Sequence, residues 1–204
     1  MSLKDTFKSD LKNEQRLAVL LDAYYKKYLR YNDFERVNDV ERQMQGIDLI
    51  FKNKSNGNIF SIDEKAQLDY PNRDLPTFAF EISYQKTGIP KKGWLFDTGK
   101  KTDFYALITN IQQDDDHKYT SCKITLVNRK KLISFLKIKN IDLTTLESYS
   151  SSDPNFHGKI TLDELNPQTE GYLYFSTQNK AEKPVNLILK LDFLVAIGIA
   201  KRLV

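Results

Sequence analysis

Three charged residues, Asp48, Asp63 and Lys65, are spaced so that a β-hairpin would gather them on one face of a sheet. Side chains alternate between the two faces of a strand, so Asp63 and Lys65 share a face and Asp48 can lie beside them. Adjacent carboxylates repel each other unless a cation lies between them, and oxygen ligands favour Mg²⁺ or Mn²⁺. A nearby lysine can orient a water, help to take its proton or stabilise a charged transition state. The three residues therefore predict metal-assisted hydrolysis of a phosphodiester, with Asp48 and Asp63 as metal ligands.

The segment from Gly46 to Lys65 predicts the hairpin itself. Two runs of alternating residues flank Asn56-Gly57, a pair that supplies the positive backbone angles of a two-residue turn. The same alternation places Glu64 with Phe60 and Ile62 on the opposite face, toward a core, where a carboxylate needs a partner. A bulge near the end of the strand would instead turn Glu64 toward the metal.

A helix from about Asp10 to Tyr31, capped by Ser9 or Asp10, is predicted before the hairpin. Leucines and tyrosines recur along one of its faces, and Glu14 extends that stripe by one turn. Its carboxylate would face whatever the helix packs on, although a plain first-turn glutamate favoured by the helix dipole is the alternative. Residues 32–45 predict a polar connection that leads into the first strand of the hairpin.

The rest of the chain predicts more sheet and two more helices. Residues 85–102 combine several glycines with lysines and predict a flexible loop, in which Lys86, Lys91 and Lys92 could contact a phosphate backbone or simply be solvated. Residues 140–154 also predict a loop. Further strands are expected at Thr77–Tyr84, Asp103–Ile111, Tyr119–Val127 and Gly171–Thr177, and helices at Arg129–Lys139 and from about Asp192.

Four consecutive candidate metal ligands, Asp114-Asp115-Asp116-His117, lie between two of these strands. Consecutive carboxylates cannot all converge on one ion without an ordered loop, and the spacing is not that of an EF-hand. The cluster therefore predicts an acidic hairpin tip. Glu81, in the middle of a strand, could be a further ligand, a partner of Lys65 or a surface residue.

Length and composition limit the class of protein. A chain of 204 residues, 40% hydrophobic and 28% charged, fits one soluble globular domain without a membrane span. The lone cysteine, Cys122, excludes an internal disulfide and is compatible with a reducing, cytoplasmic location. The net charge of +4 permits a polyanionic partner but does not require one.

In their order along the chain, these residues resemble the PD-(D/E)XK nuclease superfamily, which includes restriction endonucleases, exonucleases and Holliday junction resolvases. The resemblance covers about Asp10 to Ile111: a helix with Glu14, a strand with Asp48, and a strand with Asp63-Glu64-Lys65. It implies that the two aspartates bind the divalent metal, that the lysine assists the attacking water and that Glu14 joins the catalytic group. Gln43 and Gln45, which precede the first strand, could contact substrate or steady a ligand.

The same resemblance implies an α/β (α+β) restriction-endonuclease-like fold, in which helices flank a mixed central sheet. Residues 1–204 would form a single domain, with a nuclease-like core at 10–111 and additional strands and helices at 112–204. The expected cofactor is Mg²⁺ or Mn²⁺ and the expected substrate is DNA, with RNA not excluded; a homodimer is allowed, because many relatives dimerise to cut both strands. One alternative is a non-catalytic nucleic-acid- or protein-binding module on the same fold. Another is that the charged side chains are simply exposed on a half-solvated sheet, where Lys65 pairs with the aspartates across strands.

Overall fold

Two strands form an antiparallel hairpin, as the alternation predicts. The first begins directly after Asp48, and the second carries Asp63 and Lys65. β2 (Leu49–Asn53) pairs with β3 (Ile59–Ala66), with Leu49 opposite Ile62. The two-residue turn is wrong, because residues 54–58 connect the strands and only Gly57 among them has a positive φ, +71°. The computed structural model to which these elements belong describes residues 3–86, 88–149, 156–178 and 182–204.

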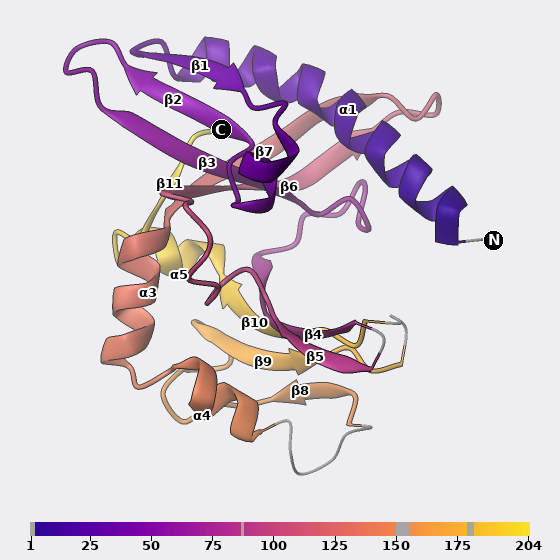
Figure 1. The fold of residues 1–204 in the computed structure, drawn as a ribbon, viewed down its shortest axis with the longest axis vertical. Coiled ribbons are helices and arrows are strands. Elements are labelled where there is room, and N and C mark those ends of the chain that lie inside the picture. Colours follow the sequence, from indigo (N-terminus) through magenta and orange to yellow (C-terminus); the bar gives the residue numbers. More distant parts are fainter. Residues whose placement is uncertain (1–2, 87, 150–155, 179–181) are drawn as a thin grey trace.

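The hairpin lies in a mixed sheet of six strands, in the order β1-β2-β3-β6-β7-β11 (Figure 1). β3 and β6 run parallel, whereas the other neighbouring strands are antiparallel. The predicted polar connection at residues 32–45 is wrong, because it contains both β1 and a short helix, α2. The bounds of the added elements are β1 (Asn32–Arg36), α2 (Val40–Met44), β6 (Phe104–Gln113), β7 (Tyr119–Asn128) and β11 (Ala200–Arg202).

Helix α1 (Leu3–Tyr28) covers one face of this sheet and begins before the predicted cap. Leu17, Leu21 and Tyr25 are buried on the apolar side chains of β2, β3 and β6. Each buried side chain of this size contributes roughly 1.5–3 kcal/mol to folding. The helix is therefore fixed over the strands that carry the charged residues.

A second, wholly antiparallel sheet packs on the opposite face of β6, in the order β5-β4-β10-β9-β8. Its inner side chains share one core with Tyr105 and Leu107 of β6. The strand predicted at residues 77–84 is present as β4, but it belongs to this second sheet, which the alternation alone does not predict. The strands are β4 (Thr77–Lys86), β5 (Ile89–Lys92), β8 (Gly158–Ile160), β9 (Gly171–Phe175) and β10 (Val185–Lys190).

Three helices complete the core between the two sheets (Figure 1). They are α3 (Arg129–Ile138), α4 (Leu143–Ser148) and α5 (Leu191–Ala196). α3 matches its prediction, whereas α4 lies in a predicted loop because Leu146 is buried there. The predicted C-terminal helix is only six residues long, and the chain continues into β11, which pairs with β7.

The structure confirms an α+β fold in which helices flank a mixed sheet. The boundary predicted at residue 111 does not separate the sheets, because β4 and β5 precede it in the second sheet while β7 and β11 follow it in the first. The restriction-endonuclease-like topology stays a prediction. Within the described ranges, none of the helices combines the length and apolar character needed to cross a membrane.

Candidate metal and catalytic site

Asp48 and Asp63 lie together where β2 begins. The backbone N–H of Asp48 donates to the Ile62 carbonyl, and its own carbonyl accepts from Val37 N–H, both at 2.8 Å. Its carboxylate Oδ2 accepts from the backbone N–H of Glu64 at 2.8 Å. The second carboxyl of the pair, Asp63, is only 1% exposed and is within hydrogen-bonding contact of the first. Strand pairing thus brings the two predicted metal ligands side by side.

The Lys65 ammonium pairs with Asp63, but burial and the second carboxyl outweigh its effect on Asp48. Burial raises the pKa of Asp48 from 3.8 to about 7, and the charge of Asp63 is the next cause; the Glu64 N–H and the Lys65 ammonium act in the opposite direction. Oδ2 of Asp63 is buried and accepts no hydrogen bond from the described residues. A cation shared by the two side chains would lower the pKa of Asp48 and would give Oδ2 of Asp63 a partner.

The donor set fits Mg²⁺ in its usual open coordination. Mg²⁺ commonly uses one or two carboxylates and completes its shell with waters and substrate phosphate. In the described parts of the chain no group of three or more His, Cys, Asp or Glu side chains could hold an ion. Asp48 and Asp63 would therefore be the side-chain ligands, and Glu14 and Glu81 are not brought into a ligand cluster with them.

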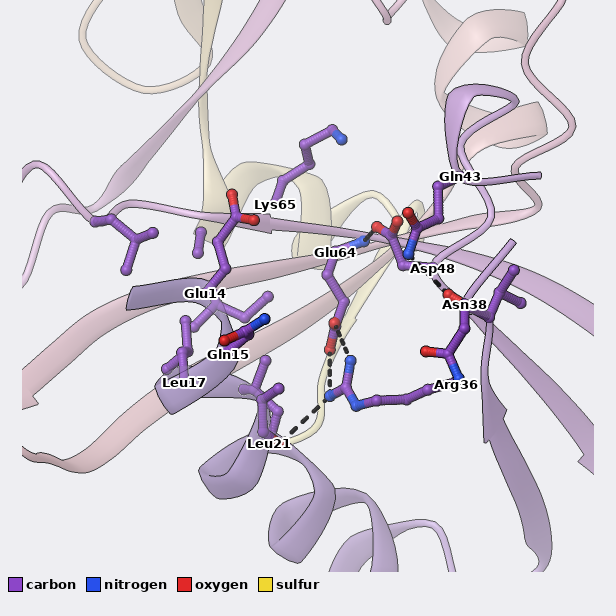
Figure 2. A pocket seen from close by; sticks show the side chains of 15 residues that line it. Glu14, Gln15, Leu17, Leu21, Arg36, Asn38, Gln43, Asp48, Glu64 and Lys65 are labelled. Atoms are coloured by element: carbon purple, nitrogen blue, oxygen red, sulfur yellow. Dashed lines mark hydrogen bonds and ion pairs between the residues drawn. The ribbon is translucent and has the colours of Figure 1, made fainter. Parts of the chain in front are cut away.

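The Lys65 ammonium hydrogen-bonds Oδ1 of Asp63 and lies 5.5 Å from the centre of the Trp94 ring. Its side chain points away from Glu14 and Glu64 (Figure 2). This places a cation on the second-sheet side of the carboxylate pair, within reach of a group bound to Asp63. The predicted grouping of Asp48, Asp63 and Lys65 is present, although their catalytic roles stay a prediction.

A pocket of about 450 Å³ lies between α1 and this site, and Glu14, Gln43, Asp48 and Lys65 line it (Figure 2). Glu14 reaches the pocket from the helix, as the apolar stripe predicts. Gln43 donates its amide N–H to the carbonyl of Val37 at 2.8 Å, and the N–H of Val37 in turn donates to the Asp48 carbonyl. Gln45 does not line this pocket; its backbone carbonyl accepts from Lys101 N–H at 2.8 Å.

Two of the three candidate phosphate contacts lie near Lys65. Lys86 and Lys92 line a neighbouring pocket of about 340 Å³ together with Lys65. Lys91 is exposed on β5 and does not line that pocket. The loop predicted at residues 85–102 is wrong at its start, where β5 pairs with β4 and fixes the positions of these lysines, whereas residues 93–102 contain no helix or strand.

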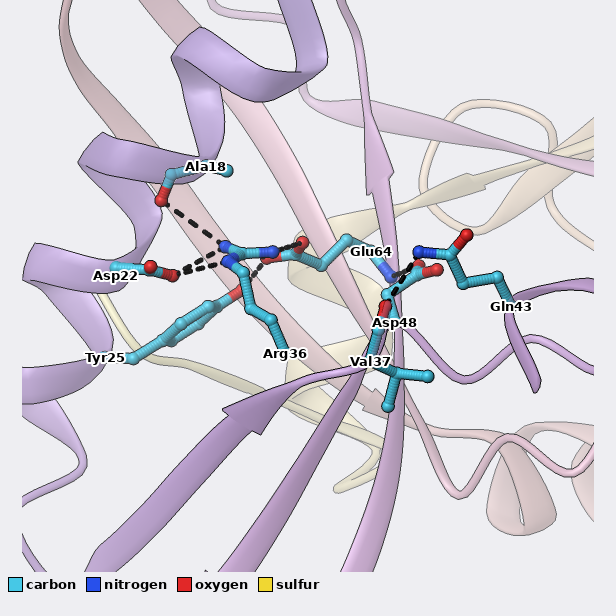
Figure 3. A network of polar contacts seen from close by, with 8 residues as sticks. All are labelled: Ala18, Asp22, Tyr25, Arg36, Val37, Gln43, Asp48 and Glu64. Atoms are coloured by element: carbon cyan, nitrogen blue, oxygen red, sulfur yellow. Dashed lines mark hydrogen bonds and ion pairs between the residues drawn. The ribbon is translucent and has the colours of Figure 1, made fainter. Parts of the chain in front are cut away.

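Sequence reasoning missed the partners of Glu64, which Figure 3 shows. The guanidinium of Arg36 donates to Glu64 at 2.8 Å and to Asp22 of α1 at 2.8 Å, and the Tyr25 hydroxyl donates to Glu64 at 2.7 Å. Burial, followed by the charge of Glu64, raises the pKa of Tyr25, so its hydroxyl remains a donor. The alternation along β1 could have indicated this partner, because it places Arg36 on the same inward face as Phe34.

The predicted inward orientation of Glu64 is confirmed, and the alternative bulge is wrong. The register between β3 and β6 runs without interruption from Ile62 to Ala66. The side chain of Glu64 therefore stays on the α1 side, while its backbone N–H holds Asp48. The middle residue of the Asp63-Glu64-Lys65 tripeptide thus joins the buried ion-pair network to the carboxylate pair.

The acidic cluster at residues 114–117 forms the tip of the β6–β7 hairpin, as predicted. Asp114 N–H donates to the Lys118 carbonyl at 3.1 Å, and His117 has a positive φ of +59°. No metal-holding group includes these residues in the described part of the chain.

Gly46 brings the backbone against the site, and its replacement tests that approach. It is buried with φ +74°, and a Cβ there would clash with the Thr102 hydroxyl and lie 3.1 Å from Oδ2 of Asp63. Gly57 has a similar φ but open space around it, so Gly57→Ala is the matched control for backbone strain. We expect Gly46→Ala to lower the free energy of unfolding by about 1 kcal/mol more than Gly57→Ala, measured by urea denaturation. Equal losses would contradict the close approach.

The raised pKa of Asp48 predicts a pH dependence of stability in metal-free protein. Between about pH 4 and pH 7 the folded protein keeps a proton on Asp48 that the unfolded chain has released. The unfolding free energy contributed by this group therefore falls as the pH rises through that window. Denaturation at several pH values should show that wild type loses stability relative to Asp48→Asn as the pH rises. Parallel pH profiles for the two proteins would be the opposite result.

No family model matches this sequence, and neither a curated protein nor a solved structure matches the chain.

Proposed function

We propose that the chain is a metal-dependent nuclease that hydrolyses phosphodiester bonds of DNA. The observation that carries this proposal is the buried contact between Asp48 and Asp63, with the ammonium of Lys65 bonded to Asp63. Two carboxylates can hold the divalent ion that activates a water for attack on a phosphodiester, and a lysine beside them can assist that attack. The resemblance to the PD-(D/E)XK superfamily points to the same chemistry.

Each residue of the site has a distinct task in this proposal. Asp48 and Asp63 hold Mg²⁺ or Mn²⁺, and the Glu64 N–H fixes the orientation of the Asp48 carboxylate. When bound, the ion polarises the phosphodiester and lowers the pKa of a water. The Lys65 ammonium orients that water by hydrogen bonding and offsets the negative charge that develops on the phosphate oxygens.

The surroundings of Lys65 support a polyanionic substrate. Lys86, Lys92 and Lys100 line a pocket together with Lys65, Glu81, Asp97 and Glu182. Lysines at this position attract a phosphate backbone without reading its sequence. Glu14 and Gln43, across the carboxylate pair, would meet the substrate or its bound waters from the α1 side.

A cleavage assay tests the proposal directly. Supercoiled plasmid, linear duplex DNA, single-stranded DNA and RNA are incubated with the protein in Mg²⁺, in Mn²⁺ and in EDTA. We expect cleavage of DNA in either metal and none in EDTA. Inactivity on every substrate in both metals would contradict the proposal; salt-sensitive DNA binding unchanged in Asp63→Asn would then identify a non-catalytic binding module.

A further inference from the structure

A second pocket, of about 370 Å³, lies on the other side of Lys65. The end of β3 and the residues after it form one wall, and β4, β9 and β10 of the second sheet contribute others. The pocket shares Lys65, Ala66 and Leu68 with the α1-side pocket, and Lys65, Glu81 and Trp94 with the lysine-lined one. It therefore opens directly beside the proposed catalytic lysine.

The lining combines flat aromatic surface with a polar group that can form new hydrogen bonds. Trp94 and Tyr174 contribute aromatic rings, and Phe78 and Ile188 contribute apolar surface. The side-chain amide of Asn186 is half-buried and makes no hydrogen bond to another described residue. An amide offers a donor and an acceptor together, which is the pattern that the edge of a nucleobase can match.

Charge decides which part of a nucleotide fits. The carboxylates of Asp69 and Glu81 line this pocket and disfavour a phosphate inside it. Lys65 lines both pockets. The neighbouring pocket adds Lys86, Lys92 and Lys100 against Glu81, Asp97 and Glu182, so lysines outnumber carboxylates there, whereas carboxylates outnumber lysines here. A ligand therefore fits both pockets if it places a neutral planar group in the aromatic pocket and an anionic chain in the lysine-lined pocket.

We propose that this pocket, beside the end of β3 and mostly on the face of the second sheet turned away from the shared core, holds an unpaired nucleobase of the substrate, with its phosphate at Lys65 and the adjoining backbone along the three further lysines. This inference rests on the proposed function for the phosphate at Lys65. A paired base is stacked inside a duplex and must be unpaired and unstacked before it can enter such a pocket. The favoured substrate is therefore single-stranded DNA, or DNA with an unpaired nucleotide at the cleavage position.

Trp94 supplies a direct readout, because it is the only tryptophan in the chain. Wild-type protein is titrated in EDTA with a hexamer of thymidylate and with an abasic hexamer of the same length and charge. We expect the base-bearing hexamer to change the tryptophan fluorescence and to bind at least fivefold more tightly, since contact of one base with an aromatic ring commonly gives that gain. Equal affinity and equal fluorescence change for the two hexamers would overturn the base pocket.

Filling the pocket gives an independent test in a variant that should fold. Ala79 lines the pocket, is exposed and pairs with Ile188 across β4 and β10, where a phenylalanine suits a strand. Ala79→Phe should lose the preference for the base-bearing hexamer, whereas the matched variant Ala79→Ser should keep it. A preference retained in Ala79→Phe, with thermal unfolding like that of wild type, would also overturn the proposal.

The cleavage assay separates the two proposals. Cleavage of DNA combined with equal binding of the two hexamers would leave the nuclease proposal standing and reject the base pocket. Binding that depends on the base and on an open pocket, without cleavage in any metal, would reject the nuclease and leave the pocket standing. If both proposals hold, single-stranded DNA should be cut at least tenfold faster than duplex, and Ala79→Phe should narrow that difference.

Discussion

Replacing Lys65 with methionine is expected to slow metal-dependent DNA cleavage by about 10²–10⁴-fold, the usual contribution of a positioned acid–base or charge-stabilising side chain. Methionine keeps much of the length and apolar character of lysine but removes the ammonium that bonds Asp63 and lies over Trp94. The water would lose its orienting group, and the phosphate oxygens would lose the nearest side-chain cation. The rate is best measured under single-turnover conditions with saturating Mg²⁺, so that product release does not hide the effect.

Lys52→Met is the matched control for this loss. Lys52 lies on β2 of the same hairpin, but it is exposed and is not among the pocket-lining residues. Its replacement should leave the cleavage rate close to that of wild type. A Lys65→Met protein that is folded and cleaves at the wild-type rate would exclude the proposed role of the lysine.

Arg36→Met is expected to lower the free energy of unfolding by about 3 kcal/mol, because it leaves the carboxylate of Glu64 without its cation. The Glu64 side chain is 15% exposed, so water replaces the lost partner only in part. The same change removes the link from β1 to Asp22 of α1. Urea denaturation monitored by circular dichroism measures the difference.

An exposed ion pair provides the comparison for Arg36. Lys54 and Asp33 pair at 3.1 Å with side chains that are 50% and 71% exposed, so Lys54→Met should cost less than about 1 kcal/mol. The double variant Arg36→Met/Glu64→Gln should recover part of the loss, because it no longer buries an unpaired charge. A loss for Arg36→Met as small as that for Lys54→Met would show that the network does not stabilise the fold.

Alternation along β2 and β3 was enough to predict the neighbours of the site. It placed Asp48 beside Asp63, because partners across an antiparallel pair share a face. It also predicted that Glu64 faces a core and needs a partner. Both predictions depend on local parity, which a strand cannot change without a bulge.

The position of each strand in a sheet could not be predicted in the same way. Phe78, Phe80 and Ile82 indicate an apolar face on β4, but such a face packs equally well on either sheet. Arg36 could not be distinguished from the other charged residues of β1, because its role depends on an ion pair with Glu64, which is far along the chain. The approach of Lys86 and Lys92 to Lys65 likewise arises from the packing of two sheets.

The parallel pairing of β3 with β6 has a consequence for how the protein folds. Ser61 N–H donates to the Asp103 carboxylate across 42 positions of sequence, and the intervening chain passes through β4 and β5 of the second sheet. Contacts this distant form only after the entropy of closing a long loop has been overcome, so they slow folding. The β2–β3 hairpin can form early from local contacts, but the cleft that would receive a substrate needs both sheets. A partly folded or newly made chain would therefore hold the acidic pair without the lysine-lined wall, and any cleavage activity would appear only as folding is completed.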